Sequence, residues 1–125
     1  MRDAASDRYF LALDDIVRGS EVVVDRPRGS AHPRYPEAIY PLDYGYLAGT
    51  VGGDGDGIDV FVGSATGAGV VAVVLTADAR KRDVEIKVLL DCAPHEVEHV
   101  RDFLWDVLGL GGYVVPRAAS GTHGA

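Results

Sequence analysis

Val70-Val-Ala-Val-Val-Leu-Thr-Ala-Asp-Ala-Arg-Lys-Arg-Asp-Val-Glu-Ile-Lys-Val-Leu-Leu90 is the stretch of the sequence that decides the fold. Its first part, residues 70–76, is an almost continuous apolar run rich in β-branched residues, which predicts a buried strand. Residues 84–90 alternate between apolar and polar side chains, which predicts a second strand. The polar segment 77–82 lies between them, so the whole stretch is expected to form a β-hairpin.

The segments before the hairpin extend it into a mainly β domain. Residues 21–25 and 58–63 are short and rich in β-branched residues, and each predicts another strand. Residues 26–43 hold four of the six prolines, a density that blocks both a helix and a central strand and predicts an irregular loop. Residues 9–19 fit a short helix or a strand equally well.

The end of the chain predicts one substantial helix. Pro94 suits a first helical turn, apolar residues recur after it at helical spacing, and three glycines lie within residues 109–112. We therefore expect a helix over residues 94–108 and a flexible tail over 116–125. The predicted fold is α+β and mainly β: a single domain over residues 1–125, built as a small OB-like β-barrel with the C-terminal helix packed on it.

Length, charge and cysteine content exclude several classes of protein. A chain of 125 residues has the length of one domain. Its formal charge of −7 argues against nucleic acid and membrane partners, because both require a basic surface. No apolar run reaches the roughly 18 residues of a membrane span, and the N-terminus lacks the basic-then-apolar order of a signal peptide. Cys92 is the only cysteine and cannot form an internal disulfide, so we expect a cytoplasmic protein.

Gly52-Gly-Asp-Gly-Asp-Gly-Ile-Asp59 carries the clearest chemical signal. Its three carboxylates repel one another unless a cation or protons neutralise them, and Mg²⁺ prefers such oxygen ligands, often completed by substrate phosphates. An EF-hand is excluded, because Ile58 and Ala65 occupy its fifth and twelfth positions. A dinucleotide-binding loop is excluded because a strand follows the glycines instead of a helix. A solvated Asp-Gly turn is the remaining alternative.

The longer stretch Tyr40-Pro-Leu-Asp-Tyr-Gly-Tyr-Leu-Ala-Gly-Thr-Val-Gly-Gly-Asp-Gly-Asp-Gly-Ile-Asp-Val60 resembles the signature of soluble inorganic pyrophosphatases. That signature reads Tyr-Pro-x-x-Tyr-Gly, then a Thr, then Asp-Gly-Asp-Pro-hydrophobic-Asp, so Gly57 replaces the usual Pro. The resemblance extends over residues 21–108. It implies a small OB-like barrel, Mg²⁺-dependent hydrolysis of inorganic pyrophosphate to phosphate, and assembly into a homo-oligomer.

The resemblance also implies a role for individual residues. The implied metal ligands are Asp54, Asp59, Asp78 and Asp83, with Asp25 where the family has a Glu. Asp56 would orient or deprotonate the attacking water, and Tyr44 would hydrogen-bond a phosphate. Arg34 stands about where the family has a phosphate-binding Lys. The implied cofactor is Mg²⁺, with Mn²⁺ as a substitute, and such chemistry relies on positioning and charge neutralisation.

Three departures from the family pattern leave other functions open. Glu85 stands where the family has a Lys, and the segment between Arg34 and Tyr40 is too short for the hairpin that carries a phosphate-binding Arg. No Tyr-Lys pair follows the predicted helix. The basic run at 80–82 either compensates or forms a solvated turn. The alternative to pyrophosphate hydrolysis is a noncatalytic or repurposed domain that binds or transforms another small molecule, such as a phosphorylated metabolite.

The histidines give a weaker signal. His95 and His99 have the i, i+4 spacing of a helical metal pair, but the sequence offers them no evident third ligand, so they also fit an ordinary helix surface. His32 lies in the Pro-rich loop near the predicted site and is a candidate substrate contact.

Overall fold

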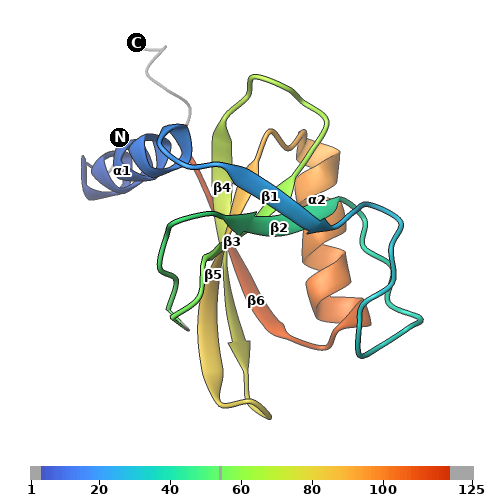
Figure 1. Ribbon diagram of the computed structural model, residues 1–125. Helices are drawn as coiled ribbons and strands as arrows, with labels where there is room; N and C mark the ends of the chain where they lie inside the picture. The colour runs from blue at the N-terminus through green and yellow to red at the C-terminus, as the bar shows by residue number, and fades with distance from the viewer. Residues whose placement is uncertain (1–3, 54, 119–125) are drawn as a thin grey trace.

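A six-stranded mixed sheet and two helices make up the part of the chain that the computed structural model describes, residues 4–53 and 55–118 (Figure 1). The helices are α1 (Ala4–Arg18) and α2 (Pro94–Asp102), and a π-helical turn, η1 (Phe103–Val107), continues α2. The strands are β1 (Val22–Arg26), β2 (Asp43–Leu47), β3 (Ile58–Val62), β4 (Val70–Asp78), β5 (Asp83–Leu90) and β6 (Gly111–Pro116). Their order in the sheet is β1-β2-β3-β5-β4-β6, with β3 and β5 parallel and the other neighbours antiparallel. Neither helix of this described part is long and apolar enough to cross a membrane.

The predicted hairpin and C-terminal helix are confirmed. β4 and β5 pair antiparallel along their length, with Asp78 opposite Asp83 next to the turn. The strands predicted at 21–25 and 58–63 are β1 and β3. The helix predicted over 94–108 is α2 together with η1. Residues 9–19, which fitted either structure, are helical up to Arg18.

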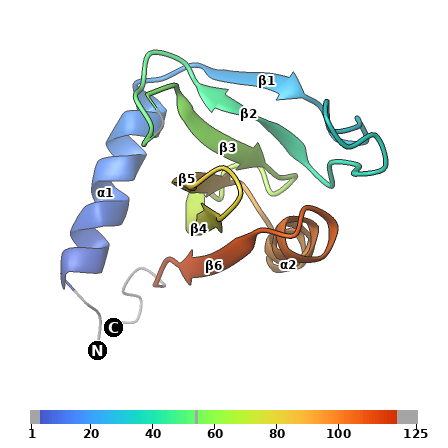
Figure 2. The same ribbon diagram turned by 90° about the horizontal axis from the view of Figure 1, so that it is seen from below.

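Two strands of the sheet, β2 and β6, were not predicted from the sequence. Residues 43–47 form β2, whose strand pattern is interrupted by Gly45. A Cβ atom at Gly45 would lie 1.8 Å from the backbone oxygen of Val23, so glycine permits the close approach of β1. β6 begins with two glycines that the sequence analysis took as the end of the helix. The predicted mainly β fold, with an OB-like sheet and a C-terminal helix packed on it, is confirmed; β1 and β6 are the two edges of the sheet, which is curved and does not close into a full barrel (Figure 2).

Apolar residues cover both faces of this sheet, and one helix packs on each face (Figure 2). The core under α1 contains Phe10, Leu13, Leu47, Val60, Val70, Val73 and Val88. The core under α2 and η1 includes Phe61, Val74, Leu89, Val100, Phe103 and Leu104. Neighbours such as Val88 and Leu89 belong to different cores, because successive side chains of a strand point to opposite faces.

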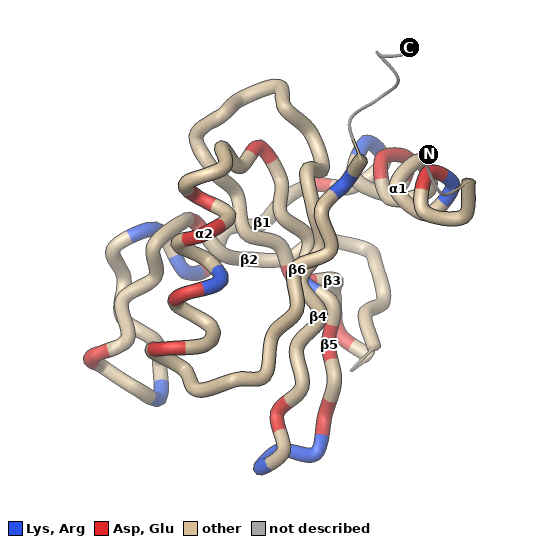
Figure 3. The backbone as a smooth tube through the Cα atoms, turned by 180° about the vertical axis from the view of Figure 1, so that it is seen from behind, with Lys and Arg blue, Asp and Glu red and all other residues tan. Residues whose placement is uncertain are grey.

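The strands on the α2 face change from apolar to polar as they approach the β4–β5 turn. Figure 3 shows Lys and Arg at the tip of this hairpin, with Asp and Glu on both of its strands. This change places charged side chains beside the α2 core, where a cavity opens.

The chain after β6 remains attached to α1. Pro116 is the last residue of β6, and the guanidinium of Arg117 donates to both carboxylate oxygens of Asp14 at 2.8 Å. The first residues of the predicted tail are therefore held in place. Residues 119–125 of that tail lie outside the described part of the chain.

Candidate active site

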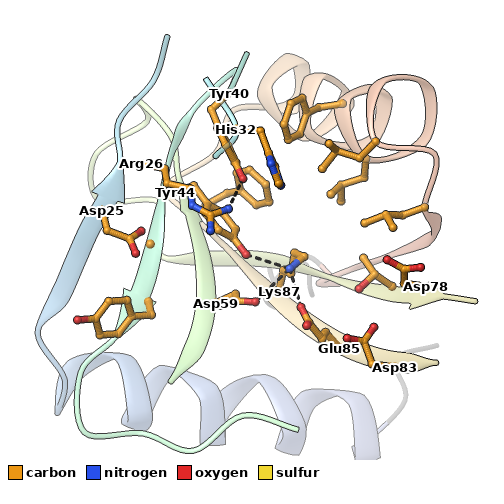
Figure 4. A pocket seen from close by; sticks show the side chains of 18 of the residues that line it. Asp25, Arg26, His32, Tyr40, Tyr44, Asp59, Asp78, Asp83, Glu85 and Lys87 are labelled. Atoms are coloured by element: carbon orange, nitrogen blue, oxygen red, sulfur yellow. Dashed lines mark hydrogen bonds and ion pairs between the residues drawn. The ribbon is translucent and has the colours of Figure 1, made fainter. Parts of the chain in front are cut away.

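A cavity of about 290 Å³ opens on the α2 face of the sheet, beside the β4–β5 hairpin (Figure 4). Its polar and charged lining residues are Asp25, Arg26, His32, Tyr40, Tyr44, Tyr46, Asp59, Thr76, Asp78, Lys81, Asp83, Glu85 and Lys87. Its apolar lining residues are Phe61, Phe103, Leu104, Leu108 and Leu110. The cavity therefore has a charged wall from the sheet and an apolar wall from η1 and the loop that follows it.

The strand register explains why these side chains meet. Asp83, Glu85 and Lys87 alternate along β5, so all three point to the same face and line the cavity. The register of β3 and β5 places Asp59 beside Lys87. The register of β4 and β5 places Asp78 opposite Asp83. Carboxylates from three strands thereby line one cavity, and two of them, Asp59 and Glu85, contact Lys87.

Lys87 is the buried centre of this charged wall, with 6% of the residue exposed. Its Nζ donates to Tyr44 Oη at 2.9 Å, Asp59 Oδ2 at 3.0 Å and Glu85 Oε1 at 2.8 Å. Burial acts to lower the pKa of Lys87, but the surrounding oxygens outweigh it and hold the pKa above its ordinary value. Lys87 is therefore an ammonium ion.

The two carboxylates that accept from Lys87 respond differently. Burial raises the pKa of Asp59, and the Lys87 ammonium opposes this only in part. Burial also acts on Glu85, but the hydrogen bond from Lys87 lowers its pKa overall. Glu85 is accordingly the firmer anionic partner of the lysine.

A β-bulge at the end of β1 brings a second cation to the cavity. The register of β1 against β2 shifts between Val24 and Arg26, so Asp25 is the extra residue and both Asp25 and Arg26 line the cavity. Arg26 Nη1 donates to Tyr40 Oη at 2.5 Å. The guanidinium lies 5.7 and 5.6 Å from the ring centres of Tyr40 and Tyr44, a cation–π arrangement that holds it on the aromatic wall.

His32 adds an uncharged donor to the same cavity. Its Nδ1 accepts from the backbone N–H of Arg34 at 3.0 Å and that of Tyr35 at 3.4 Å. An accepting Nδ1 leaves the proton of the neutral ring on Nε2. Burial, together with nearby positive charges such as Arg26, lowers the pKa of His32, so the neutral ring predominates at pH 7. His32 can therefore offer an N–H group without adding charge.

The structure brings together only part of the predicted site. The predicted residues that line the cavity are Asp25, Tyr44, Asp59, Asp78 and Asp83. Asp56, to which the sequence analysis gave the catalytic role, is exposed and is not among the lining residues. Arg34 is exposed and lines a neighbouring hollow instead. Asp54 lies outside the described residues.

The neighbouring hollow has a volume of about 380 Å³ and continues the cavity towards the Pro-rich loop. It shares Arg26, His32, Asp78, Lys81, Leu108 and Leu110 with the cavity and adds Pro33, Arg34, Tyr35, Arg80 and Gly109. Four of these residues are Arg or Lys and one is an acid, so the hollow favours an anion.

Sequence reasoning missed Lys87, Arg26 and Tyr40 as site residues. The period-2 pattern of β5 carried a usable signal for Lys87, because it follows Asp83 and Glu85 on the same face. The parallel pairing that sets Asp59 beside Lys87 joins β3 to β5, with the whole of β4 between them in the chain, and no local pattern predicts it. The bulge that turns Arg26 into the cavity had no local signal either.

The remaining candidates lie apart from the cavity. The rings of His95 and His99 meet edge-on at 5.7 Å on the exposed side of α2. Cys92 is buried in the α2 core, and burial raises its pKa to about 12, so it behaves as a packed apolar residue. In residues 4–53 and 55–118 no three His, Cys, Asp or Glu side chains are grouped closely enough to hold a metal ion.

The cavity suits a divalent cation beside Asp78 and Asp83, but not between Asp59 and Glu85. Among the described lining residues, five carboxylates face three Lys or Arg side chains, which leaves two negative charges in excess. Asp78 and Asp83 are direct cross-strand neighbours whose like charges repel, and two carboxylates completed by substrate oxygens suit Mg²⁺. Between Asp59 and Glu85 the place of a cation is already filled by the Lys87 ammonium, so a metal ion does not fit there.

Comparisons with known proteins converge on one family. The sequence model of the inorganic pyrophosphatase family matches residues 16–102, well over half of the chain. A solved structure of an inorganic phosphatase from Anaplasma phagocytophilum is 18% identical with a TM-score of 0.51, over 76% of this chain and 81% of that one. An inorganic pyrophosphatase from Helicobacter pylori is 18% identical with a TM-score of 0.52, over 78% and 82%. At this identity the two structures establish a similar fold alone. No curated protein matches the sequence significantly.

Proposed function

The chain belongs to the inorganic pyrophosphatase family, and from this premise we propose that it hydrolyses inorganic pyrophosphate to phosphate in the cavity beside the β4–β5 hairpin. The strongest support is that Tyr44, Asp59, Asp78 and Asp83, which are separate in the sequence, line one cavity with basic residues beside them. Phosphoryl transfer of this kind requires little covalent chemistry from the protein. It requires that a highly charged anion be positioned and its charge be neutralised.

The proposal includes Mg²⁺, with Mn²⁺ as a substitute, held by Asp78 and Asp83. The described lining has an excess of negative charge, so a pyrophosphate anion entering it needs further positive charge. A bound divalent cation supplies that charge and lowers the pKa of a coordinated water. The two carboxylates that face each other across β4 and β5 are the described pair best placed to hold such an ion.

The chain's own donors would bind and orient the phosphates. The Arg26 guanidinium, held on its aromatic wall, can pair with two phosphate oxygens. Burial raises the pKa of Tyr44, so the phenol stays protonated at neutral pH and can donate to a third oxygen. Lys81 lies where the cavity meets the neighbouring hollow and adds a flexible cation. The apolar wall with Phe103 excludes water and strengthens these electrostatic contacts.

The group that orients the attacking water remains a prediction. Sequence reasoning gave this role to Asp56, which is exposed and lies two residues before β3. The near-isosteric substitution Asp56→Asn removes the ability to accept a proton and leaves the fold intact. Loss of most turnover would support the role of Asp56. Full turnover in this variant would assign the role to a carboxylate inside the cavity.

A phosphate-release assay tests the proposal. The purified protein is expected to release phosphate from pyrophosphate in millimolar Mg²⁺ and to lose this activity in excess chelator. The double substitution Asp78→Asn with Asp83→Asn should lower turnover at least about 100-fold, because it removes the ligands of the proposed ion. Asp106→Asn, at an exposed position of η1, is the matched control and should retain activity. A wild-type protein inert towards pyrophosphate over a range of Mg²⁺ concentrations and pH would refute the proposal.

A second candidate function is the binding or hydrolysis of a larger phosphorylated metabolite. Two observations favour it: the neighbouring hollow extends the basic surface beyond the cavity, and Glu85 occupies the place of a phosphate-binding Lys. A panel of nucleoside diphosphates, nucleoside triphosphates and sugar phosphates separates the two functions. Faster phosphate release from one of these compounds than from pyrophosphate would favour the second function. Equal inertness towards all of them would exclude it as an enzymatic activity.

The proposed enzyme is further expected to act in the cytoplasm as a homo-oligomer. Size-exclusion chromatography with light scattering measures the mass against the 13.3 kDa of one chain. A mass equal to that of one chain at micromolar concentration would contradict the oligomer.

A further inference from the structure

The Lys87 ammonium occupies a fully formed cation site. An ammonium group has three N–H donors, and each of the three has an oxygen partner here: Tyr44 at 2.9 Å, Asp59 at 3.0 Å and Glu85 at 2.8 Å. The side chain is 8% exposed, and those of Asp59 and Glu85 are 25% and 21% exposed. Figure 4 shows the ammonium between the two carboxylates, on the floor of the cavity. The site is therefore satisfied in hydrogen bonds and largely withdrawn from solvent.

We propose that the Lys87 ammonium is a built-in cation that takes the place of a divalent metal ion between Asp59 and Glu85. Mg²⁺ requires its oxygen ligands at about 2.0–2.1 Å in near-octahedral array. The oxygens that such an ion would need already accept hydrogen bonds from Lys87. A divalent ion at this place would also have to approach a resident positive charge of the same sign. The lysine and the ion therefore exclude each other.

The acidic residue at position 85 supports this assignment. A carboxylate facing a phosphate is unfavourable unless a cation neutralises it. Glu85 and Lys87 lie two residues apart on the same face of β5, so the neutralising cation is carried by the same strand. The register of β3 and β5 brings Asp59 to the other side of that cation. The two carboxylates thus share one cation that the protein itself supplies, and the three groups together keep a single negative charge.

The assignment changes the number of divalent ions that the cavity should take up. With Lys87 counted, the described lining has two negative charges in excess, which equals the charge of one divalent ion. The cross-strand pair Asp78 and Asp83 is the place left for it. The inference rests on the proposed function only in treating the cavity carboxylates as cation ligands. It does not depend on whether pyrophosphate is hydrolysed.

Mn²⁺ binding in the absence of pyrophosphate tests the inference directly. Isothermal titration calorimetry and Mn²⁺ electron paramagnetic resonance would count the ions bound by the wild type and by Lys87→Met, which is unbranched and one atom shorter and removes the charge. The variant is expected to bind one more Mn²⁺ per chain than the wild type. Arg101→Met is the control: it removes one positive charge from an exposed position of α2 outside the cavity and should leave the count unchanged. An unchanged count in Lys87→Met would overturn the inference.

A second variant decides the question if Lys87→Met does not fold. Asp59→Asn leaves Lys87 in place, and the wild-type Mn²⁺ count should then be unaffected. Loss of one Mn²⁺ in Asp59→Asn would show that Asp59 is a metal ligand despite the lysine and would overturn the inference. Because these counts are made without substrate, failure of the inference is distinguishable from failure of pyrophosphate hydrolysis. A protein can lack hydrolysis and still gain the Mn²⁺ site in Lys87→Met.

Discussion

Replacement of Glu96 by Gln or Ala gives a quantitative test of how α2 is attached to the sheet. Glu96 is 5% exposed, and its carboxylate accepts from the backbone N–H of Ala93 at 2.8 Å and of Ser64 at 3.1 Å. It also accepts from the Ser64 hydroxyl at 3.0 Å. One side chain therefore caps the first turn of α2 and ties it to the loop after β3. Because α2 continues into η1, this anchor also fixes the apolar wall of the cavity.

The expected losses of stability follow from the hydrogen-bond donors that each substitution leaves without an acceptor. Gln keeps one acceptor oxygen for the backbone donors, and its amide can donate to the Ser64 hydroxyl. Glu96→Gln therefore loses only the charge assistance, worth about 1–1.5 kcal/mol. Glu96→Ala leaves two backbone N–H groups without an acceptor at about 1–3 kcal/mol each, so we expect a loss of about 3–4 kcal/mol. For a chain of this length the larger loss lowers the melting temperature by roughly 10–15 °C.

The pH dependence of stability shows whether Glu96 stabilises the fold through its negative charge or through its shape alone. Burial acts to raise the pKa of Glu96, but the hydrogen bonds from Ala93 and Ser64 lower it overall. A lowered folded-state pKa means that this stabilisation is fully present above the unfolded value of about 4.3 and is lost as the pH falls through the folded-state pKa. The wild type and Glu96→Gln should therefore converge in stability in acid. Equal destabilisation by Gln and Ala at pH 7, or a constant gap between Gln and wild type down to acid pH, would refute the reasoning.

The assay is urea unfolding followed by the fluorescence of Trp105, the only tryptophan, and by circular dichroism. Trp105 donates from Nε1 to the backbone oxygen of Gly112 at 2.8 Å, so it reports the contact between η1 and β6. Glu98→Gln makes the same chemical change at an exposed position of α2 and is the control. It should stay within about 0.5 kcal/mol of the wild type.

Three further predictions follow from the cavity and the core. Lys87→Met should lower the free energy of unfolding in urea, measured without metal, by about 3 kcal/mol, because it leaves two carboxylates without their buried partner. Lys81→Met, at an exposed position, should lower it by less than about 0.5 kcal/mol, and equal losses in the two variants would contradict the burial of Lys87. Gly45→Ala should lower stability by at least about 2 kcal/mol, because its Cβ would lie 1.8 Å from the Val23 oxygen; an unchanged melting temperature would show that β1 yields freely. Cys92 should react with a thiol reagent only in urea, since burial raises its pKa to about 12; rapid reaction of the folded protein would contradict that burial.

The sequence predicted those parts of the fold whose periodicity is uninterrupted. The apolar run at 70–76 and the alternation at 84–90 identify the hairpin, because a strand with apolar side chains on both faces and a strand with one polar face have these two patterns. β2 was missed because Gly45 lies at its centre, and glycine usually indicates a turn. In β2 it serves the close approach of β1, a tertiary requirement that has no local pattern. β6 was missed because its first two residues are glycines that also fit the end of a helix.

The sequence predicted several residues of the candidate site, but it did not predict which of them contact one another. The resemblance to the family signature assigned Tyr44 and Asp59 to one site, and the hairpin turn is sufficient to set Asp78 opposite Asp83. The partner of Asp59 depends on the parallel neighbour of β3, which is β5 and not the next strand in the chain. Such a crossover is decided by packing of the whole sheet, so the central position of Lys87 became visible only in the structure.

Glu85 and Lys87 form an ion pair, and the two positions are therefore best considered together. The family pattern has its cation at position 85, whereas this chain has Glu85 there and the ammonium two residues further along, one full period of β5. The shift keeps the cation on the cavity face but moves it by about 7 Å to a place where Asp59 can share it. Restoring the family residue by Glu85→Lys alone would therefore set two ammonium groups on the same face of β5 and remove one of the two carboxylates that Lys87 contacts. Only a paired exchange at 85 and 87 preserves the charge balance of the cavity floor, so the departure at Glu85 is a rearrangement of the site rather than the loss of one contact.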